Sequence, residues 1–291
     1  MTKVLITGTN SFIGRSFRRF SKYKDTEEIS LFVNEPEDID FSGYDTILHL
    51  AAIVHQTRKI ADAEYFRVNR DLCLRVADQA KKSGVRHFIF MSTIKVYHES
   101  VVESGIRNED SMCCPEDAYG RSKYEAEVRL KELRDNNFKV SIIRSSLVYG
   151  EGVKANMLSM IKLVDKCPIL PFKNIDNKRN FVYIENLIGY IDRVIELKAS
   201  GTFIAIDPES ISTSVLVNYI SKFLGKKVIL FALPWFVLRL MSFFLPGIIR
   251  RLFYSLEFEN SETLRALDFS VPFTTEEGIR RTINSYKSLS R

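Results

Sequence analysis

The sequence predicts an α/β fold, in which a doubly wound parallel sheet of the Rossmann type is followed by a smaller C-terminal lobe. Two observations support this prediction. In the first half of the 291-residue chain, short apolar runs alternate with longer helical patterns, as in a parallel sheet wrapped by helices. After residue 150 the rhythm becomes irregular, and six prolines separate shorter elements.

Each apolar run predicts one strand, and each longer periodic pattern predicts one helix. Strands are expected at residues 4–6, 29–33, 46–50, 86–91 and 139–144, and helices at 12–20, at 63–83 and from Tyr119 onward. Six or seven strands in this order form a doubly wound sheet. The stretch between Val33 and Tyr44 is too short for a helix and a strand, so one strand–helix unit is expected to be truncated there.

Composition excludes several classes of protein. The formal charge is +6 and the pI is near 9.0, but lysine and arginine are spread among 36 acidic residues, so a nucleic-acid partner is not expected. The four cysteines and four histidines show no metal-ligand spacing, and no metal is predicted. No apolar signal segment precedes the first strand, so a cytoplasmic, reducing setting is expected.

The most apolar part of the chain is residues 228–256. Arg239, Pro246, Arg250 and Arg251 interrupt it, and no uncharged stretch reaches the roughly 18 to 20 residues that a membrane span needs. Stable membrane insertion is therefore not expected. A helical hairpin that is buried or forms a lid is favoured over a helix lying on a membrane surface.

A glycine turn joins the first strand to the first helix. Backbone amides in such a turn can hold a pyrophosphate. The residues expected at the cofactor are Gly8, Asn10, Ser11, Phe12, Ile13 and Gly14, although their spacing differs from G-x-G-x-x-G. We therefore expect a dinucleotide-binding domain over residues 1–150, to which a segment around 178–206 returns. The rest of 151–291 is expected to be mainly a substrate-binding lobe.

The residues after the second strand are expected to meet the adenosine ribose. Asn34 and Glu35 occupy this place in the sequence, and Glu35 would favour NAD. Arg15, just past the glycine turn, could instead accept the additional phosphate of NADP. The sequence therefore predicts NAD and does not exclude NADP.

Tyr119 and Lys123 lie one helical turn apart, which places both on one helix face. A nearby cation favours the phenolate and lowers the pKa of a tyrosine. This pair is therefore predicted to act as an acid–base unit on an alcohol.

Together with the glycine turn, these motifs resemble the extended short-chain dehydrogenase/reductase family. The resemblance also covers His49-Leu50-Ala51-Ala52, Met91-Ser92-Thr93 and Arg144-Ser145-Ser146-Leu147-Val148-Tyr149-Gly150. It implies that Tyr119 is the acid–base residue, that Lys123 lowers its pKa and holds the nicotinamide ribose, and that Thr93 bonds the reacting oxygen. Leu50, Ala51 and Ala52 would pass under the middle of the cofactor. Ser145 is expected at the cofactor, at the nicotinamide contact where the family usually has proline.

The resemblance also implies a substrate site. Arg179 matches an arginine that binds a nucleotide diphosphate in relatives, Asn156 matches a position that reaches the diphosphate or sugar, and Phe172 could pack on a uracil ring. Lys95, close to Thr93, could touch the substrate. The structural alternatives are a surface ion pair for Arg179 and a core position for Phe172.

Within that family, the chain looks most like the nucleotide-sugar epimerases, dehydratases and 4-reductases. The favoured function is a 4-epimerase that acts on a UDP-hexose or UDP-N-acetylhexosamine through a 4-keto intermediate with bound NAD. One alternative is an NAD(P)H-dependent reductase of a UDP-4-keto-6-deoxy-hexosamine in surface-polysaccharide synthesis. An alternative of another class is a non-catalytic cofactor-sensing or scaffold protein. A homodimer is expected by resemblance.

Overall fold

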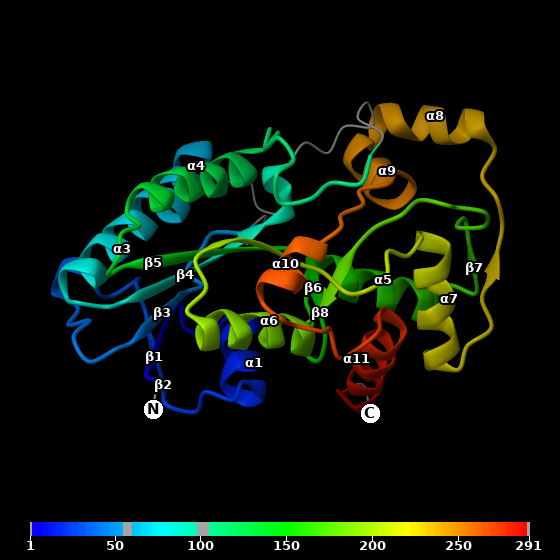
Figure 1. The fold of residues 1–291 in the computed structure, drawn as a ribbon. Helices are drawn as coiled ribbons and strands as arrows, with labels where there is room; N and C mark the ends of the chain where they lie inside the picture. Colours follow the sequence, from blue (N-terminus) through cyan, green and yellow to red (C-terminus); the bar gives the residue numbers. More distant parts are fainter. Residues whose placement is uncertain (1, 55–59, 98–104, 290–291) are drawn as a thin grey trace.

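The computed structural model describes residues 2–54, 60–97 and 105–289. Its centre is a six-stranded parallel sheet with the strand order β2-β1-β3-β4-β5-β9 (Figure 1). The strands are β1 Val4–Thr7, β2 Thr26–Ile29, β3 Thr46–His49, β4 His87–Thr93, β5 Lys139–Ser145 and β9 Gly201–Ala205. The strand order changes direction beside β1, and in doubly wound sheets ligands bind at this point, beyond the carboxyl ends of the strands.

Alternate residues of the buried strands supply two separate cores. On one face, Leu5 packs with α3 Cys73–Lys82 and α4 Ala118–Glu132. On the other, Ile6 packs with α1 Phe12–Phe20 and α6 Ile184–Leu197. Figure 1 shows these two pairs of helices above and below the sheet. The sequence prediction of a doubly wound α/β sheet is confirmed.

The second predicted strand, at residues 29–33, was wrong. The strand is Thr26–Ile29, while Phe32 is 98% exposed in a turn. An edge strand needs burial on only part of its surface, so the polar Thr26-Glu27-Glu28 run could form it, and the apolar run after it was misleading. Between β2 and β3 there is only the short helix η1 Pro36–Asp38 and no strand, so the predicted truncation is present.

The predicted helix at 63–83 is one run with a local irregularity. It consists of α2 Asp62–Phe66, the π-helical turn η2 Arg67–Leu72 and α3. π-Helical turns often occur at functional sites.

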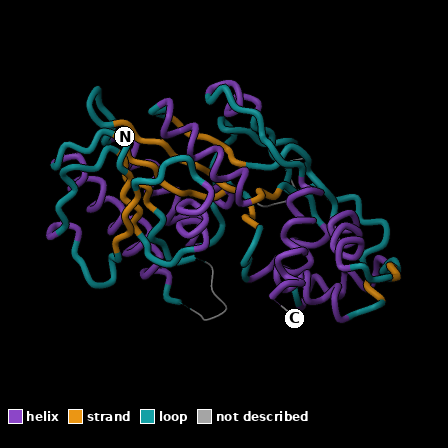
Figure 2. The backbone as a smooth tube through the Cα atoms, turned by 90° about the horizontal axis from the view of Figure 1, so that it is seen from below, coloured by secondary structure: helices purple, strands orange, loops and turns teal. Residues whose placement is uncertain are grey.

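The C-terminal part is mainly helical and lies beside the sheet (Figure 2). Its helices are α5 Ala155–Lys166, α7 Thr213–Leu224, α8 Trp235–Phe244, α9 Pro246–Phe253, α10 Ser261–Ala266 and α11 Thr275–Leu289. Two short parallel pairs accompany them, β6 Leu147–Tyr149 with β8 Phe181–Tyr183, and β7 Ile169–Leu170 with β10 Ile229–Leu230.

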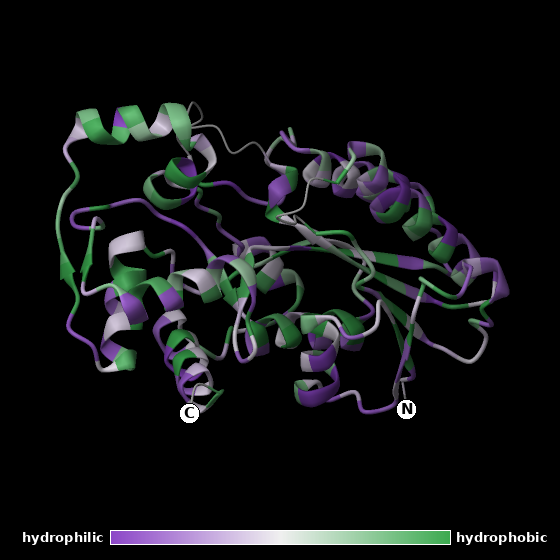
Figure 3. Ribbon diagram, turned by 180° about the vertical axis from the view of Figure 1, so that it is seen from behind, coloured by the Kyte–Doolittle hydropathy of each residue, from purple (hydrophilic) through white to green (hydrophobic). Residues whose placement is uncertain are grey.

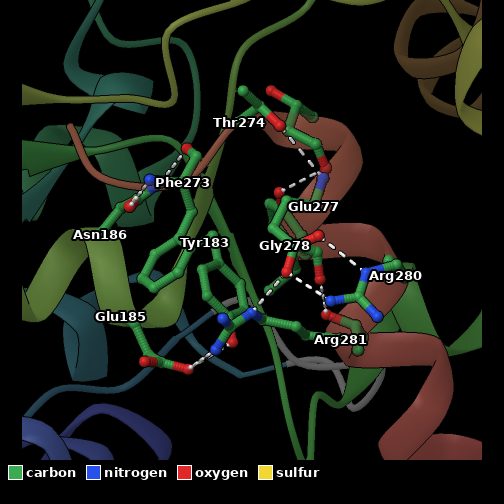
Figure 4. A network of polar contacts seen from close by, with 12 residues as sticks. Tyr183, Glu185, Asn186, Phe273, Thr274, Glu277, Gly278, Arg280 and Arg281 are labelled. Carbon is green, nitrogen blue, oxygen red and sulfur yellow. Dashed lines mark hydrogen bonds and ion pairs between the residues drawn. The ribbon is translucent and has the colours of Figure 1, made fainter.

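Buried polar contacts join this part to the sheet. Asp207, just after β9, accepts hydrogen bonds from the Tyr149 hydroxyl at 2.7 Å, the Tyr183 backbone N–H at 2.8 Å and the Asn186 side chain at 2.7 Å. Asn186 also donates to the carbonyl of Phe273, just before α11 (Figure 4). Burial raises the pKa of Asp207 to about 6.

The hairpin of α8 and α9 was expected to be buried or to form a lid, and burial is wrong for α8. None of its residues is buried, and Trp235 and Phe243 are 72% and 82% exposed. Figure 3 shows α8 as an apolar helix at the outer edge of the molecule. Among the described residues, no helix combines the length and the apolar character that crossing a bilayer requires.

Candidate active site

The Thr93 and Tyr119 hydroxyls meet at the carboxyl end of β4. Thr93 is the last residue of β4 and is 9% exposed, while Tyr119 is the second residue of α4. Asp117 caps α4 by accepting from the Gly120 N–H at 2.7 Å, which fixes where the helix begins and where Tyr119 points. The structure thus brings together two of the three predicted catalytic residues.

Burial raises the pKa of Tyr119 to about 12, and a hydrogen bond with Thr93 acts in the opposite direction. Tyr65 lies against Tyr119 with ring centroids 6.4 Å apart and contributes to the low-dielectric surroundings. The phenol is therefore protonated at neutral pH in the protein by itself.

Lys123, the third predicted catalytic residue, is buried one turn further along α4. Its Nζ donates to the Met91 carbonyl at 3.0 Å and lies 4.4 Å from the centroid of the Phe90 ring. Burial lowers the pKa of Lys123 to about 8. In the protein by itself, burial dominates the pKa of Tyr119 and the Lys123 ammonium meets the Met91 carbonyl, so the lowering of the Tyr119 pKa by Lys123 stays a prediction.

Lys95 lies at the same centre. Its Nζ forms an ion pair with Asp117 at 2.6 Å and is 6.0 Å from the centroid of the Tyr119 ring. The sequence analysis expected Lys95 close to Thr93 but did not identify Asp117 as its partner. The only sign of Asp117 in the sequence was its position just before the helix that carries Tyr119. The ion pair places a cation beside the Tyr119 ring.

The glycine turn has the geometry of a phosphate cradle. Gly8 has φ +99°, and a Cβ there would lie 2.7 Å from the Ala51 backbone nitrogen, so only glycine lets the β1 and β3 loops approach. Ser11 caps α1 by accepting from the Gly14 N–H at 2.9 Å, and Asn10 has φ +58°. The other two residues predicted here, Phe12 and Ile13, form the first turn of α1. These residues fit a dinucleotide at the amino end of a nine-residue helix.

Leu50, Ala51 and Ala52 follow β3 beside this turn. Sequence reasoning missed the residue that holds their loop in place, Asn69 in the π-helical turn. Its side chain accepts from the Ile53 N–H at 2.8 Å and donates to the Ile53 carbonyl and the Ser122 hydroxyl, both at 3.0 Å. A lone asparagine on the apolar side of a predicted helix was the only signal in the sequence.

Asn34 and Glu35 do not lie at the end of β2. That strand ends at Ile29, so Ser30 is the first residue after it. The Asn34 amide donates back to the Ser30 carbonyl at 2.8 Å, and Glu35 pairs with Arg75 at 2.8 Å. The two residues predicted to meet the adenosine ribose therefore lie beyond the end of β2, whereas the Glu28 carboxylate within β2 lies beside Gly14 of the glycine turn.

Beneath the site lies a buried ion pair that the sequence did not reveal. Arg144 and Glu127 are 2.6 Å apart, and neither is more than 2% exposed. Glu127 also accepts from the Ser92 hydroxyl at 2.5 Å, next to Thr93 in β4. Ser145 donates to the Ser92 carbonyl at 3.4 Å. The pair therefore braces the end of β4.

The predicted substrate residues lie in the C-terminal part. Arg179 donates to the carbonyls of Arg250 and Tyr254 at 3.5 and 3.1 Å, which joins it to the end of α9. Asn156 is exposed at the second position of α5. Phe172 is buried and packs against Phe253. It therefore occupies a core position, which was the alternative to packing on a uracil ring.

Comparison with known proteins agrees with this geometry. A family model described as the NAD dependent epimerase/dehydratase family matches residues 4–206. A Vibrio cholerae protein named UDP-glucose 4-epimerase is 33% identical over 313 residues, covering 97% of this chain and 95% of that protein.

Two further similarities are more distant. An Escherichia coli O157:H7 protein named N-acetyl-alpha-D-glucosaminyl-diphospho-ditrans,octacis-undecaprenol 4-epimerase is 25% identical over 203 residues, 68% of this chain and 60% of that protein. The structure of a UDP-glucuronic acid 4-epimerase from Bacillus cereus in complex with NAD has the same fold, with a TM-score of 0.76, 20% identity and full coverage of both chains. The chain therefore belongs to the NAD dependent epimerase/dehydratase family.

Proposed function

We propose that this protein is a nucleotide-sugar 4-epimerase that acts on a UDP-hexose or UDP-N-acetylhexosamine with bound NAD. The observation that carries the proposal is the hydrogen-bonded pair of Thr93 and Tyr119 at the carboxyl end of β4, beside the buried ammonium of Lys123. The name of the Vibrio cholerae relative, which matches along nearly the whole chain, supports 4-epimerisation.

The side chains divide the work of proton transfer. Tyr119 would remove the proton from the O4 hydroxyl of the sugar and return it after the 4-keto sugar has turned its other face. The Thr93 hydroxyl would hold O4 in line with the phenol. Bound NAD would supply reversible hydride transfer at C4, so the reaction would have no net redox change. Lys123, with N–H groups beyond the one that meets Met91, would bind the nicotinamide ribose.

The deciding experiment uses the purified protein without added cofactor. We would denature one portion and identify any released nicotinamide by mass spectrometry, and incubate another with UDP-N-acetylglucosamine and UDP-glucose. Retained NAD together with formation of the 4-epimer supports the proposal. Absence of NAD with both sugars unchanged argues against it and favours the 4-keto-sugar reductase, which would then show oxidation of added NADPH or NADH with a 4-keto-6-deoxy sugar.

A second candidate is the same 4-epimerisation on a sugar joined through diphosphate to a polyprenol. The E. coli relative is named for such a substrate. The exposed aromatic side chains of α8 favour this candidate, because they give a lipid a surface to meet. Parallel incubations with UDP-N-acetylglucosamine and with the undecaprenyl-diphosphate sugar in detergent distinguish the two. Conversion of only the UDP-sugar excludes the second candidate.

A further inference from the structure

Helix α8 exposes an apolar face that nothing in the described molecule covers. Trp235, Phe236, Leu240, Phe243 and Phe244 are all exposed. Spacings of three, four, seven and eight residues place Phe236, Leu240, Phe243 and Phe244 on one side of the helix, and Trp235 lies at the edge of this side. Soluble proteins seldom expose a continuous patch of this kind unless it meets a partner. We call these five side chains the α8 face.

The charged side chains of residues 228–256 are all positive, and Asp176 lines the same cavity as Arg239. Residues 228–256 contain Arg239, Arg250 and Arg251 and no aspartate or glutamate, and Lys226 and Lys227 precede them. Arg250 pairs with Glu116 at 2.6 Å, whereas Arg239 is exposed beside the α8 face and has no ion-pair partner among the described residues. The complementary partner is therefore apolar and bordered by negative charge.

The length of α8 restricts how it can contact an apolar partner. With ten residues, α8 is about 15 Å long, half of a bilayer's hydrocarbon thickness, so it can lie in a membrane surface but cannot cross. Trp and Phe beside arginine are typical of helices at the lipid–water boundary. A second copy of this chain is a less suitable partner. If two copies packed their α8 faces together about a two-fold axis, Arg239 of one copy would lie against Arg239 of the other, and residues 228–256 contain no acidic residue to offset this repulsion.

We propose that the α8 face docks the protein on the surface of a bilayer that contains anionic phospholipids. The aromatic side chains enter the headgroup region, and Arg239 contacts lipid phosphate. This inference does not depend on which sugar is turned over, so it stands or falls separately from the proposed function.

Docking there would put a membrane beside the substrate end of the molecule. A cavity of about 460 Å³ lies between α8, α9 and residues 171–176, with Trp235, Leu238 and Arg239 in its wall. The end of α9 supplies the carbonyls that hold Arg179, and Arg250 reaches Glu116, next to the cap of α4. The end of α9, the helix that follows α8, thus contacts both Arg179 and Glu116, and Glu116 lies just before the helix that carries Tyr119.

The chain contains one tryptophan, Trp235, which is a built-in probe of the α8 face. We would add vesicles of phosphatidylcholine, alone or mixed with phosphatidylglycerol, to the full chain and record tryptophan emission and co-sedimentation. The mixed vesicles should shift the emission to the blue, shield Trp235 from iodide and pellet the protein, and added salt should weaken the effect.

Three variants keep the probe and test the face. Phe243→Ser with Phe244→Ser should weaken binding by more than about tenfold, because apolar area is lost. Arg239→Glu should weaken binding to mixed vesicles by more than about fivefold, since a cation near the surface is replaced by an anion. Phe32→Ser is the matched control, an exposed phenylalanine beyond β2, and should bind as the unaltered protein does.

The variants must lose vesicle binding without unfolding. Thermal melting, followed by circular dichroism, shows whether each variant remains folded. These side chains are exposed, so the variants should melt close to the unaltered protein. The proposal is overturned if unaltered protein leaves Trp235 emission unchanged with mixed vesicles, or if the double serine variant binds them equally well. It is also overturned if the double variant converts a dimer to a monomer in sedimentation while vesicles bind neither form, because the α8 face would then join two copies.

Discussion

At the scale of single residues, Tyr119 is held in a setting that keeps its phenol protonated. Burial raises its pKa to about 12, and the hydrogen bond with Thr93 offsets only part of this effect. A phenol in this state is ready to donate a proton to a 4-keto oxygen. Accepting one from a sugar alcohol requires positive charge beside the ring, and the buried Lys123 ammonium is one turn away.

Removing the hydroxyl tests that role. Tyr119→Phe should lower kcat by about 10²- to 10⁴-fold, the usual contribution of a positioned acid–base group. Bound nicotinamide, identified after denaturation, should be unchanged. Tyr65→Phe is the matched control, because its ring packs on Tyr119 and only a neighbouring hydroxyl is lost. Equal activity in the two variants would remove Tyr119 from the mechanism.

Lys95 allows a second test at this scale. Lys95→Met keeps the length of the side chain but breaks the ion pair with Asp117. Asp117 still caps α4 through the Gly120 N–H, so the helix should stay in place. If Lys95 touches the substrate, KM for the sugar nucleotide should rise several-fold, while the amount of bound nicotinamide stays the same. A variant with unchanged KM and lowered thermal stability would make Lys95 a structural residue.

At the scale of elements, the π-helical turn 67–72 ties two parts of the site together. Asn69 is fully buried, bonds both backbone groups of Ile53 after the β3 loop, and donates to Ser122 of α4. Asn69→Ala should cost about 2–5 kcal/mol of unfolding free energy, because it leaves buried partners unpaired. The loop that carries Ala51 and Ala52 would loosen at the same time, so affinity for NAD should fall.

The control for this prediction is Ser122→Ala, which removes only one partner of Asn69. It should cost less, about 1 kcal/mol, and leave NAD affinity nearly unchanged. Urea unfolding and NAD titration of the two variants give both quantities. If Asn69→Ala loses stability but binds NAD normally, Asn69 supports only the fold.

Elements also show what sequence could predict. Buried strands such as β4 have continuous apolar runs, and the helix over 63–83 has a clear period, so both were predicted correctly. The edge strand Thr26–Ile29 was missed, because its polar side chains are accommodated by neighbours in space rather than by a pattern along the chain. The ion-pair partners of Arg144 and Lys95 were missed for the same reason. An ion pair between distant segments has no periodicity.

At the scale of the whole molecule, the site lies at a meeting of two parts. The glycine turn, the β3 loop and Thr93 all lie at the carboxyl ends of neighbouring strands, where parallel topology places them. Arg179 belongs to the C-terminal part and is held by the end of α9. If Arg179 binds the substrate as predicted, the relation between the two parts decides how the substrate meets Tyr119 and Thr93.

Asp207 is a main connection between these parts, and its ionisation should be visible in global stability. Its pKa is about 6 in the folded protein because it is buried, against about 3.9 in an unfolded chain. Between about pH 4 and 6 the folded state therefore holds a proton that the unfolded state has released, so stability falls as pH rises through this window. The difference corresponds to about 3 kcal/mol.

Asp207→Asn removes this titration while keeping the shape and the acceptor for Tyr183 and Asn186. The Tyr149 hydroxyl, which donates to Asp207, can turn to accept from the new amide. Urea unfolding of both proteins from about pH 4 to 7 should show the native protein losing about 3 kcal/mol relative to the variant, with most of the change complete by about pH 6. Parallel stability curves would mean that Asp207 is ionised throughout, with its three donors outweighing the cost of burial. The junction would then be held by a charge rather than by a neutral hydrogen-bonded acid.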